Sequence, residues 1–311
     1  MNDMLIIKTQ GIISEFFFVM RDFLENILTQ AILCDISVKI EISGRRKMMQ
    51  KRKLLLFDLD DTLLRSDKTI SKHTLEVLGQ CREIGYLIGV STSRGETNSL
   101  LYIAELHPDV VICSGGAVVK YKDQYVYTAE FTEEETNQMI HTVWDICGSE
   151  CKMTIDTLNA HFWSFRRSRD EIDANWADTI FADFSNLNER ALKLCAEIFQ
   201  PELAKQLAEA LPDCDCIKFV DGEWYKFTQK EATKENAIKK FSEISGIPLS
   251  DVIAFGDDLP DIGMLKLCGT GVAMGNAVAE VKAAADVVIG TNDEDGIAEY
   301  LLESCLEQYD K

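Results

Sequence analysis

Short apolar runs alternate with amphipathic stretches after residue 51, and this alternation constrains the fold more than any other feature of the chain. Five runs have the composition of strands buried on both faces: KLLLFD (53–58), YLIGVS (86–91), DVVICS (109–114), DVIAFG (251–256) and DVVI (286–289). Between the first two runs, apolar residues recur at helical spacing from Ser71 to Gly85. This β-α-β order predicts an α/β fold with a doubly wound parallel sheet, whose ligands bind at the carboxyl ends of the strands.

The alternation is interrupted between residues 132 and 229. This stretch contains two helix-like segments, 133–145 and 201–210, and aromatic-rich, strand-like segments at 161–165, 216–220 and 223–227. The parallel pattern then resumes at Lys234. We therefore predict an inserted α+β domain over residues 132–229 and a discontinuous core domain made of residues 49–131 and 230–311.

The first 48 residues form a separate N-terminal extension in this interpretation. Residues 44–47 (GRRK) can be encoded by a purine tract typical of a bacterial ribosome-binding site, and Met48 and Met49 follow directly. We expect the natural start at one of these two methionines, which would leave residues 1–48 untranslated in the native gene. The alternative is a docking helix over residues 15–28.

Charge and cysteine content limit the class of protein. The 311 residues include 32 Lys and Arg against 52 Asp and Glu, a net charge of −20, so a nucleic-acid or anionic membrane surface would be a local exception. No stretch of 18 apolar residues exists. The ten cysteines are scattered, several within apolar runs. We expect a cytoplasmic protein with reduced cysteines and no nucleic-acid or membrane partner; its oligomeric state is not indicated.

Charged and hydroxyl residues follow the predicted strands. The first strand ends in DLDD (58–61), the second in STSR (91–94) and the fourth in GDDLPD (256–261), while Lys234 opens the helix before the fourth. Each cluster alone is compatible with a helix cap or a solvated turn. All of these clusters would lie at the same end of the predicted sheet, so together they predict a functional site. Crowded carboxylates at such a site favour the binding of a hard divalent cation.

These clusters resemble the motifs of a known family, the haloacid dehalogenase superfamily, and specifically its Cof-like, type IIB hydrolases. The resemblance spans residues 51–302 and rests on DLDDTLL (58–64), STSR (91–94), the lysine of KENAI (234–238), GDDLPD (256–261) and GVAMGNAVAEVKAAADVV (271–288). It implies a Rossmann-like core, with the inserted domain acting as a type IIB cap.

The resemblance also implies catalytic roles. Asp58 would be the nucleophile that forms an aspartyl-phosphate, and Asp60 the general acid and then the general base. Thr92 would donate a hydrogen bond to a phosphate oxygen, and Lys234 would neutralise charge on the transferring group.

A Mg²⁺ site is implied at the same place. Its ligands would be the carboxylates of Asp58 and Asp257 and the main-chain carbonyl of Asp60, while Asp261 would support the metal or Lys234. Pro260 stands where the family usually has Asn, and we expect this change to weaken support for the metal site without abolishing activity.

Substrate contacts are the least constrained by sequence. Candidates near the phosphate are Ser93, Arg94 and Gly115. In the family that this chain resembles, Gly is frequent at the position of Ser93 and Asn at the position of Gly115. In the cap, Arg166 and Arg167, with Arg169, could bind a second anionic group of the substrate; the alternative is a solvated turn.

The expected function is a Mg²⁺-dependent phosphatase of small phosphorylated metabolites, such as sugar phosphates or phosphorylated cofactors. One alternative is a hexose phosphomutase of the same superfamily, which uses the same intermediate. The other is a catalytically weakened phosphate-binding protein, an alternative motivated by Pro260.

Overall fold

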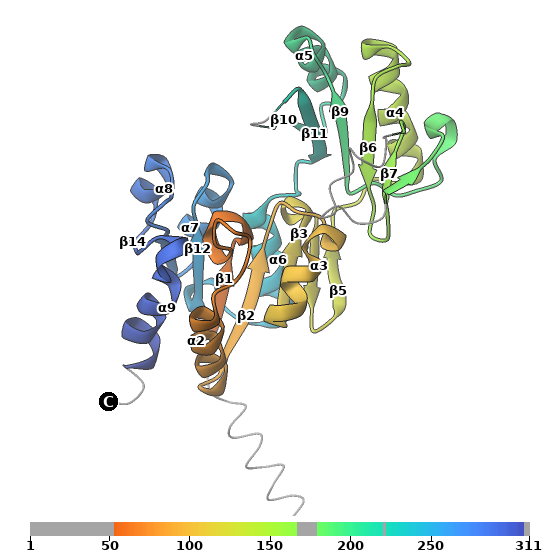
Figure 1. The fold of residues 1–311 in the computed structure, drawn as a ribbon. Coiled ribbons are helices and arrows are strands. Elements are labelled where there is room, and N and C mark those ends of the chain that lie inside the picture. The colour runs from red at the N-terminus through yellow and green to blue at the C-terminus, as the bar shows by residue number, and fades with distance from the viewer. Residues whose placement is uncertain (1–52, 167–178, 220–221, 308–311) are drawn as a thin grey trace, which may run out of the picture. The chain divides into compact units, whose positions relative to one another are not determined.

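The computed structural model describes residues 53–166, 179–219 and 222–307 (Figure 1). The predicted extension over residues 1–48 lies outside this range. Within it, no helix is both long enough and apolar enough to cross a membrane. The described residues form two sheets, one of which is inserted in the chain between two halves of the other.

The larger sheet has eight strands in the order β14-β13-β12-β1-β2-β3-β4-β5. They are β1 (Lys53–Phe57), β2 (Tyr86–Ser91), β3 (Val110–Cys113), β4 (Val118–Tyr121), β5 (Gln124–Thr128), β12 (Val252–Gly256), β13 (Thr270–Ala273) and β14 (Val287–Val288). All neighbours from β14 to β3 are parallel, whereas β4 and β5 continue the sheet as an antiparallel hairpin. The predicted α/β fold with a mainly parallel sheet is confirmed, but the sequence analysis missed β4, β5 and β13.

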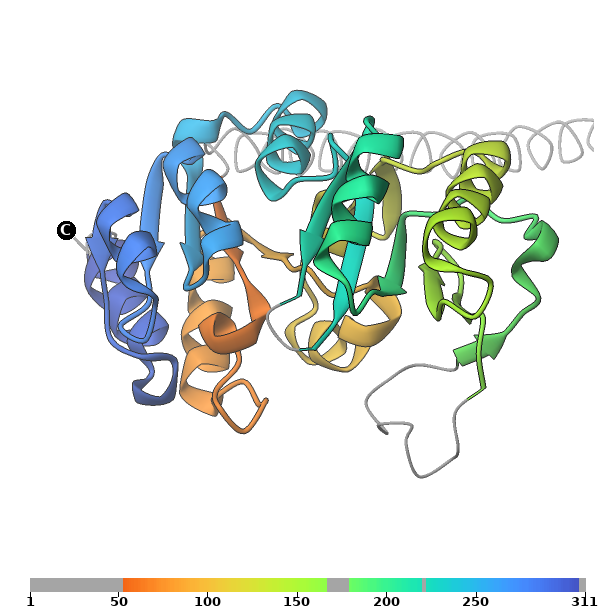
Figure 2. The same ribbon diagram turned by 90° about the horizontal axis from the view of Figure 1, so that it is seen from above.

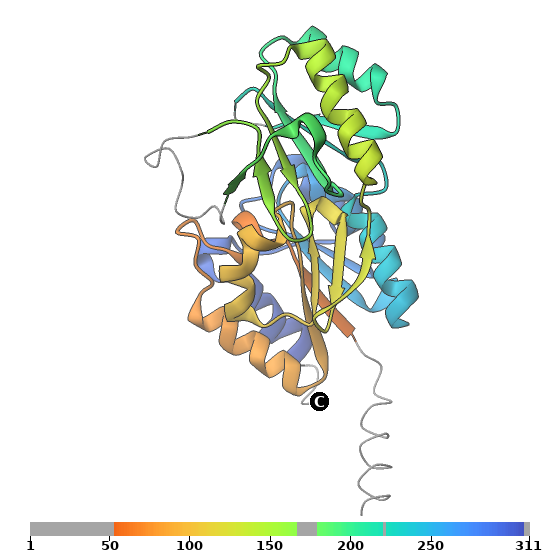
Figure 3. The same ribbon diagram turned by 90° about the vertical axis from the view of Figure 1, so that its right-hand side faces the viewer.

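Helices cover both faces of this sheet. They are α2 (Lys72–Glu83), α3 (Glu96–Leu106), α6 (Lys234–Ser245), α7 (Ile262–Leu267), α8 (Ala279–Ala284) and α9 (Gly296–Leu301). Figure 3 shows α2 and α3 on one side of the strands and α6 on the other. The chain runs outward from β1 through β2 to β3, and outward from β12 in the opposite direction, so the topological switch point lies between β1 and β12.

The inserted sheet has six strands in the order β10-β11-β9-β6-β7-β8. They are β6 (Met153–Asp156), β7 (His161–Trp163), β8 (Thr179–Phe181), β9 (Lys193–Glu197), β10 (Cys214–Lys218) and β11 (Trp224–Gln229), accompanied by α4 (Glu133–Cys147) and α5 (Pro201–Ala210). Figure 2 shows α4 and α5 together on one side of these strands.

Alternation along the inserted strands separates two faces. Tyr225 and Phe227 of β11 and Leu194 of β9 belong to an apolar cluster with side chains of α4 and α5. The residues between them point to the opposite side, because successive side chains of a strand alternate. This opposite side, which we call the polar face of the inserted sheet, carries Asp156, His161, Lys193, Lys226 and Thr228.

The start of α6 is fixed by two local features. Thr233 caps the helix, since its hydroxyl accepts a hydrogen bond from the Asn236 amide at 3.2 Å. Gly116 lies against this cap: a Cβ on Gly116 would fall 2.2 Å from the Thr233 carbonyl oxygen, and the φ of Gly116 is +107°. The contact anchors Lys234, the first residue of α6, against the loop that follows β3.

We expect Gly116→Ala to lower the free energy of unfolding by about 2–4 kcal/mol, because the new methyl group meets backbone atoms and the φ is strained. Gly79→Ala is the matched control: no atom lies within 4 Å of its added methyl, and in helix α2 it should stabilise by about 0.5–1 kcal/mol. Denaturant unfolding of both variants measures the difference. Equal effects would contradict the packing argument.

Candidate active site

Three carboxylates converge at the switch point between β1 and β12. Asp58 follows β1 directly, Asp257 follows β12, and Asp261 ends the short turn Leu259–Asp261. One oxygen from each lies within 4.8 Å of the others. Asp58 and Asp261 are buried, and Asp257 is half-buried. The sequence grouped these residues correctly at one end of the sheet.

Lys234 joins two of these carboxylates. Its Nζ lies 2.6 Å from Asp58 Oδ1 and 2.6 Å from Asp261 Oδ1, and the residue is only 4% exposed. Burial by itself lowers the pKa of Lys234, but the two carboxylates outweigh it and the pKa lies above its usual value. The lysine therefore remains charged beside the predicted nucleophile.

Asp261 is held in place by the backbone around it. Its Oδ2 accepts hydrogen bonds from the amides of Asp257 at 3.0 Å and Asp258 at 3.2 Å. Gly256 makes room for this arrangement, since a Cβ there would lie 2.5 Å from the Cβ of Asp261. With one oxygen on Lys234 and the other on the loop amides, Asp261 orients both the lysine and Asp257. Pro260 occupies the exposed first turn of this segment, where proline is well tolerated.

The electrostatics of the cluster favour a cation. Burial raises the pKa of Asp58 above its usual value despite Lys234, and burial also raises the pKa of Asp257 to about 6. The charge of Asp261 raises both pKa values further, while the Thr62 hydroxyl donates to Asp257 Oδ1 at 2.7 Å and opposes the rise. Crowded carboxylate oxygens of this kind are the ligands that hard divalent cations prefer, so the residues fit such an ion.

Asp60, the predicted acid and base, is bound by cations. Arg94 donates to it through Nε at 2.6 Å and Nη2 at 2.7 Å, and Lys68 Nζ lies 3.2 Å away. Burial raises the pKa of Asp60, but Arg94 and Lys68 together bring it below its usual value. Arg94, predicted to contact substrate, thus contacts Asp60 in this structure, and its role toward substrate stays a prediction. The next residue, Asp61, has a left-handed φ of 58°, a backbone conformation that glycine adopts without strain.

The other predicted phosphate-site residues meet where β2 and β3 end. The Gly115 amide donates to the Thr92 carbonyl at 3.1 Å, and Gly115 has a φ of +71°. The Thr92 side chain is buried and accepts a hydrogen bond from the Arg94 amide at 3.1 Å, while Ser93 is exposed. The hydrogen bond between Gly115 and Thr92 therefore joins the loop after β2 to the loop after β3. Their contacts with phosphate stay predictions.

Of the arginines proposed for a second anionic group, the structure describes only Arg166. Arg166 is exposed, and its guanidinium lies 4.1 Å from the ring centre of Phe181 on the edge strand β8. Arg167 and Arg169 lie outside the described residues.

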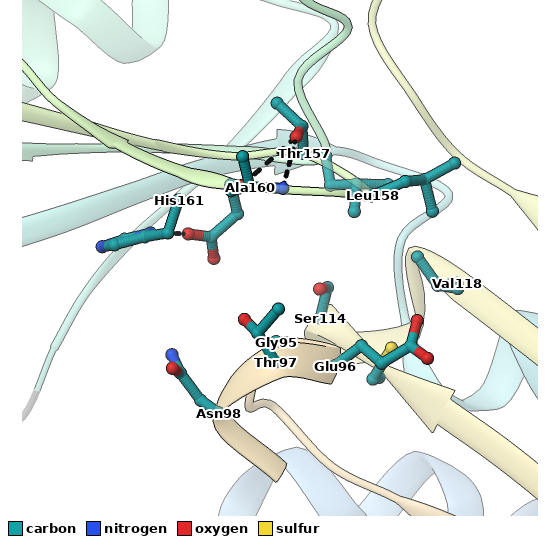
Figure 4. Close-up of a pocket in the computed structure, with 13 residues that line it drawn as sticks. Gly95, Glu96, Thr97, Asn98, Ser114, Val118, Thr157, Leu158, Ala160 and His161 are labelled. Carbon is teal, nitrogen blue, oxygen red and sulfur yellow. Dashed lines mark hydrogen bonds and ion pairs between the residues drawn. The ribbon is translucent and has the colours of Figure 1, made fainter. Parts of the chain in front are cut away.

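A pocket lies between the two sheets. It is lined on one side by residues 95–98 and Ser114, and on the other by Thr157, Leu158 and His161 (Figure 4). Asp156 also belongs to its lining. The Nδ1 of His161 contacts Asp156, whose other carboxylate oxygen lies 2.6 Å from Lys193 Nζ. No spacing in the sequence indicates this buried group, since its members come from three different strands.

Comparison with known proteins agrees with this fold and site. Residues 55–301 match the family model of the haloacid dehalogenase-like hydrolases. The carboxylates at the switch point and the inserted sheet thus define a phosphotransfer-type hydrolase, and the chain belongs to the haloacid dehalogenase-like hydrolase family.

Its relatives are bacterial phosphatases. The 5-amino-6-(5-phospho-D-ribitylamino)uracil phosphatase YitU of Bacillus subtilis (strain 168) is 26% identical over 267 residues, which cover 82% of this chain and 98% of YitU. The pyridoxal phosphate phosphatase YbhA of Escherichia coli (strain K12) is 28% identical, covering 80% and 97%. Among solved structures, a HAD subclass IIB sugar phosphatase has a TM-score of 0.67 at 25% identity, covering 81% and 98%. Phosphate monoesters are the substrates that the family and these relatives support.

The Asp156 ion pair generates a stability prediction. Burial raises the pKa of Asp156, but Lys193 and His161 outweigh it and hold the pKa well below its usual value. A lowered pKa stabilises the fold above the unfolded value of about 3.8, and this contribution is lost only as pH falls through the folded pKa. Asp156→Asn should therefore cost about 3–5 kcal/mol, because Lys193 is left buried and unpaired.

Thermal unfolding at pH 8, where Asp156 is ionised, measures this cost. Adding Lys193→Met to Asp156→Asn should recover part of the loss. Glu223→Gln, which breaks an exposed pair with Lys218 near the same sheet, should change little. A double variant no more stable than the single one would count against the ion pair as the cause.

Proposed function

We propose that this protein is a Mg²⁺-dependent phosphatase that hydrolyses small phosphorylated molecules through an aspartyl-phosphate on Asp58. The observation that carries the proposal is the position of Asp58: its carboxylate lies at the switch point, 2.6 Å from a buried lysine and within 4.8 Å of oxygens of two further carboxylates. A nucleophilic carboxylate needs a cationic environment if it is to approach a phosphate dianion.

The metal would be held by the carboxylates of Asp58 and Asp257 and by the main-chain carbonyl of Asp60. When bound, the ion neutralises charge on the phosphate and on Asp58, which Lys234 alone does not achieve. Asp261 would act through its neighbours: it orients Lys234 and the amide of Asp257.

The side chains around Asp58 carry out the bond-breaking and proton-transfer steps. Asp58 Oδ attacks phosphorus, the bond to the ester oxygen breaks, and Asp60 protonates that oxygen as the alcohol leaves. Asp60 then accepts a proton from the water that attacks the aspartyl-phosphate, and phosphate is released. The Thr92 hydroxyl and Lys234 bind the phosphoryl oxygens. Since Arg94 holds Asp60 in its ionised form, the acid step requires this pair to separate when substrate binds and Asp60 to take up a proton from solvent before the alcohol leaves.

The relatives of this chain support a small substrate. Residues of the inserted sheet and of the segments after β2 and β3 line a common pocket (Figure 4), so the inserted sheet lies where it can contact the substrate. The relatives named above act on a phosphorylated ribitylamino-uracil and on pyridoxal phosphate. We infer that residues 132–229 are the cap of this enzyme and that its substrate is a phosphorylated metabolite or cofactor.

Asp58→Asn should reduce kcat for p-nitrophenyl phosphate by on the order of 10⁴-fold or more, because the amide is a poor nucleophile. Asp123→Asn, an exposed substitution in the β4–β5 turn, is the control and should match the parent. Activity is measured as inorganic phosphate released. Asp58→Asn turning over the ester at the parent's rate would refute the mechanism, and interconversion of hexose phosphates without phosphate release would identify a mutase instead.

Mg²⁺ should stabilise the protein by relieving repulsion within the carboxylate cluster. At about 100 times its Kd the ion contributes about 2.7 kcal/mol, a rise in Tm of roughly 5 °C. Differential scanning fluorimetry with Mg²⁺ and with EDTA measures this shift. Asp257→Asn should lose most of it, whereas Asp123→Asn should keep it. The same shift in both variants would place the ion elsewhere.

A further inference from the structure

Lys226 brings a positive charge from the inserted sheet to the phosphate end of the site. It lies in the middle of β11, on the polar face, between Trp224 and Thr228. Its Nζ is 3.9 Å from the point that a Cβ on Gly115 would occupy. Since the Gly115 amide is bonded to the Thr92 carbonyl at 3.1 Å, the ammonium group lies over the joined loops that follow β2 and β3.

Lys226 differs from the other cations of the site because it has no carboxylate partner among the residues that the structure describes. Lys234 pairs with Asp58 and Asp261, Arg94 pairs with Asp60, and Lys193 pairs with Asp156. Among the described residues, no carboxylate oxygen lies within the 4 Å of an ion pair with Lys226.

The surroundings of Lys226 make this unpaired charge costly. The side chain is half-buried. Burial, and then the charges of Lys193 and Lys234, hold its pKa below the usual value, with Asp215 acting weakly in the other direction. An ammonium group placed among other cations and partly out of water is stabilised when an anion binds next to it.

We propose that Lys226 binds an anionic group, a carboxylate or a second phosphate, on the part of the substrate that leaves as the alcohol. The inference rests on the proposed phosphatase function and narrows its substrate class to phosphate esters that carry a second negative charge. Lys226 is then a specificity-determining residue of the cap.

The leaving part of the substrate is a better match for Lys226 than the phosphoryl group. Lys234 already lies against Asp58, so the transferring phosphoryl group has its own buried cation. Lys226 belongs to the inserted sheet and approaches the Thr92 and Gly115 loops from outside, on the side where the remainder of the substrate must extend. An anionic group there would also relieve the repulsion between Lys226 and the paired lysines.

Paired substrates of similar size test the proposal. For the carboxylate, 3-phosphoglycerate is compared with glycerol 3-phosphate, and for the phosphate, fructose 1,6-bisphosphate is compared with fructose 6-phosphate. The parent enzyme should prefer the more acidic member of at least one pair in kcat/KM. Lys226→Met should reduce that preference by about 10- to 100-fold, mainly through KM, because a charge-assisted hydrogen bond made in both ground and transition states is lost.

Three further variants sharpen the test. Lys230→Met, an exposed lysine just beyond β11, should keep the parent's preference. Lys226→Arg should retain most of the preference for the more acidic ester. Lys226→Glu should reverse this preference toward the ester that lacks the second anionic group. Thermal unfolding of each variant shows whether the inserted sheet remains folded.

The outcomes separate this inference from the proposed function. A parent with no preference for either acidic ester, or a preference unchanged in Lys226→Met, overturns the inference while leaving the phosphatase proposal standing. A lower Tm with an unchanged preference also overturns it, because Lys226 would then serve only the fold, for instance by interacting with Asp215. If the parent hydrolyses neither member of either pair nor p-nitrophenyl phosphate, the proposed function fails, and the inference fails with it.

Discussion

The buried contact of Lys234 with Asp58 and Asp261 is the interaction on which the site depends. The three residues come from the end of β1, the start of α6 and the turn after β12, so they connect the segments before and after the insertion. A buried carboxylate without its cation is strongly destabilising. The same contact therefore closes the discontinuous core and places a charged lysine beside the proposed nucleophile.

Glycines make this approach of charged groups sterically feasible. Gly256 leaves space for the Asp261 side chain, and Gly116 lets the start of α6 approach the loop after β3. Neither contact involves a ligand, yet both fix where Lys234 points. The proposed chemistry thus rests on close backbone packing at two positions as much as on the charged residues themselves.

The inserted sheet adds a second level of organisation. One face is packed against α4 and α5, and the other presents polar side chains, including Lys226 and the buried pair of Asp156 with Lys193. Such a division lets a single sheet be stable through its apolar face and take part in recognition through its polar one. The proposed substrate class follows from this second face.

Much of the core fold and of the candidate site could be predicted from the sequence, because buried parallel strands and the polar residues at their ends have a recognisable local pattern. The apolar runs at 53–58 and 251–256 correctly predicted β1 and β12. The charged residues that follow these runs predicted Asp58, Asp60 and Asp257 at the carboxyl end of the sheet. The hairpin of β4 and β5 was missed, since short half-exposed strands lack the continuous apolar run of a buried one.

The substrate-contacting residues of the inserted domain could not be predicted from the sequence. Arg166 and Arg167 were predicted to bind a second anionic group because they follow a strand-like run. In the structure Arg166 is exposed and its guanidinium lies over the Phe181 ring. Lys226 gave no comparable signal, because nothing in its strand tells which neighbouring loops its side chain will meet. The sequence by itself determined the fold family and the end of the sheet where the site lies, as these follow from local patterns of burial and charge. Only the tertiary structure decided which cations are neutralised and which has no partner among the described residues, because ion pairing depends on distances between strands far apart in the chain.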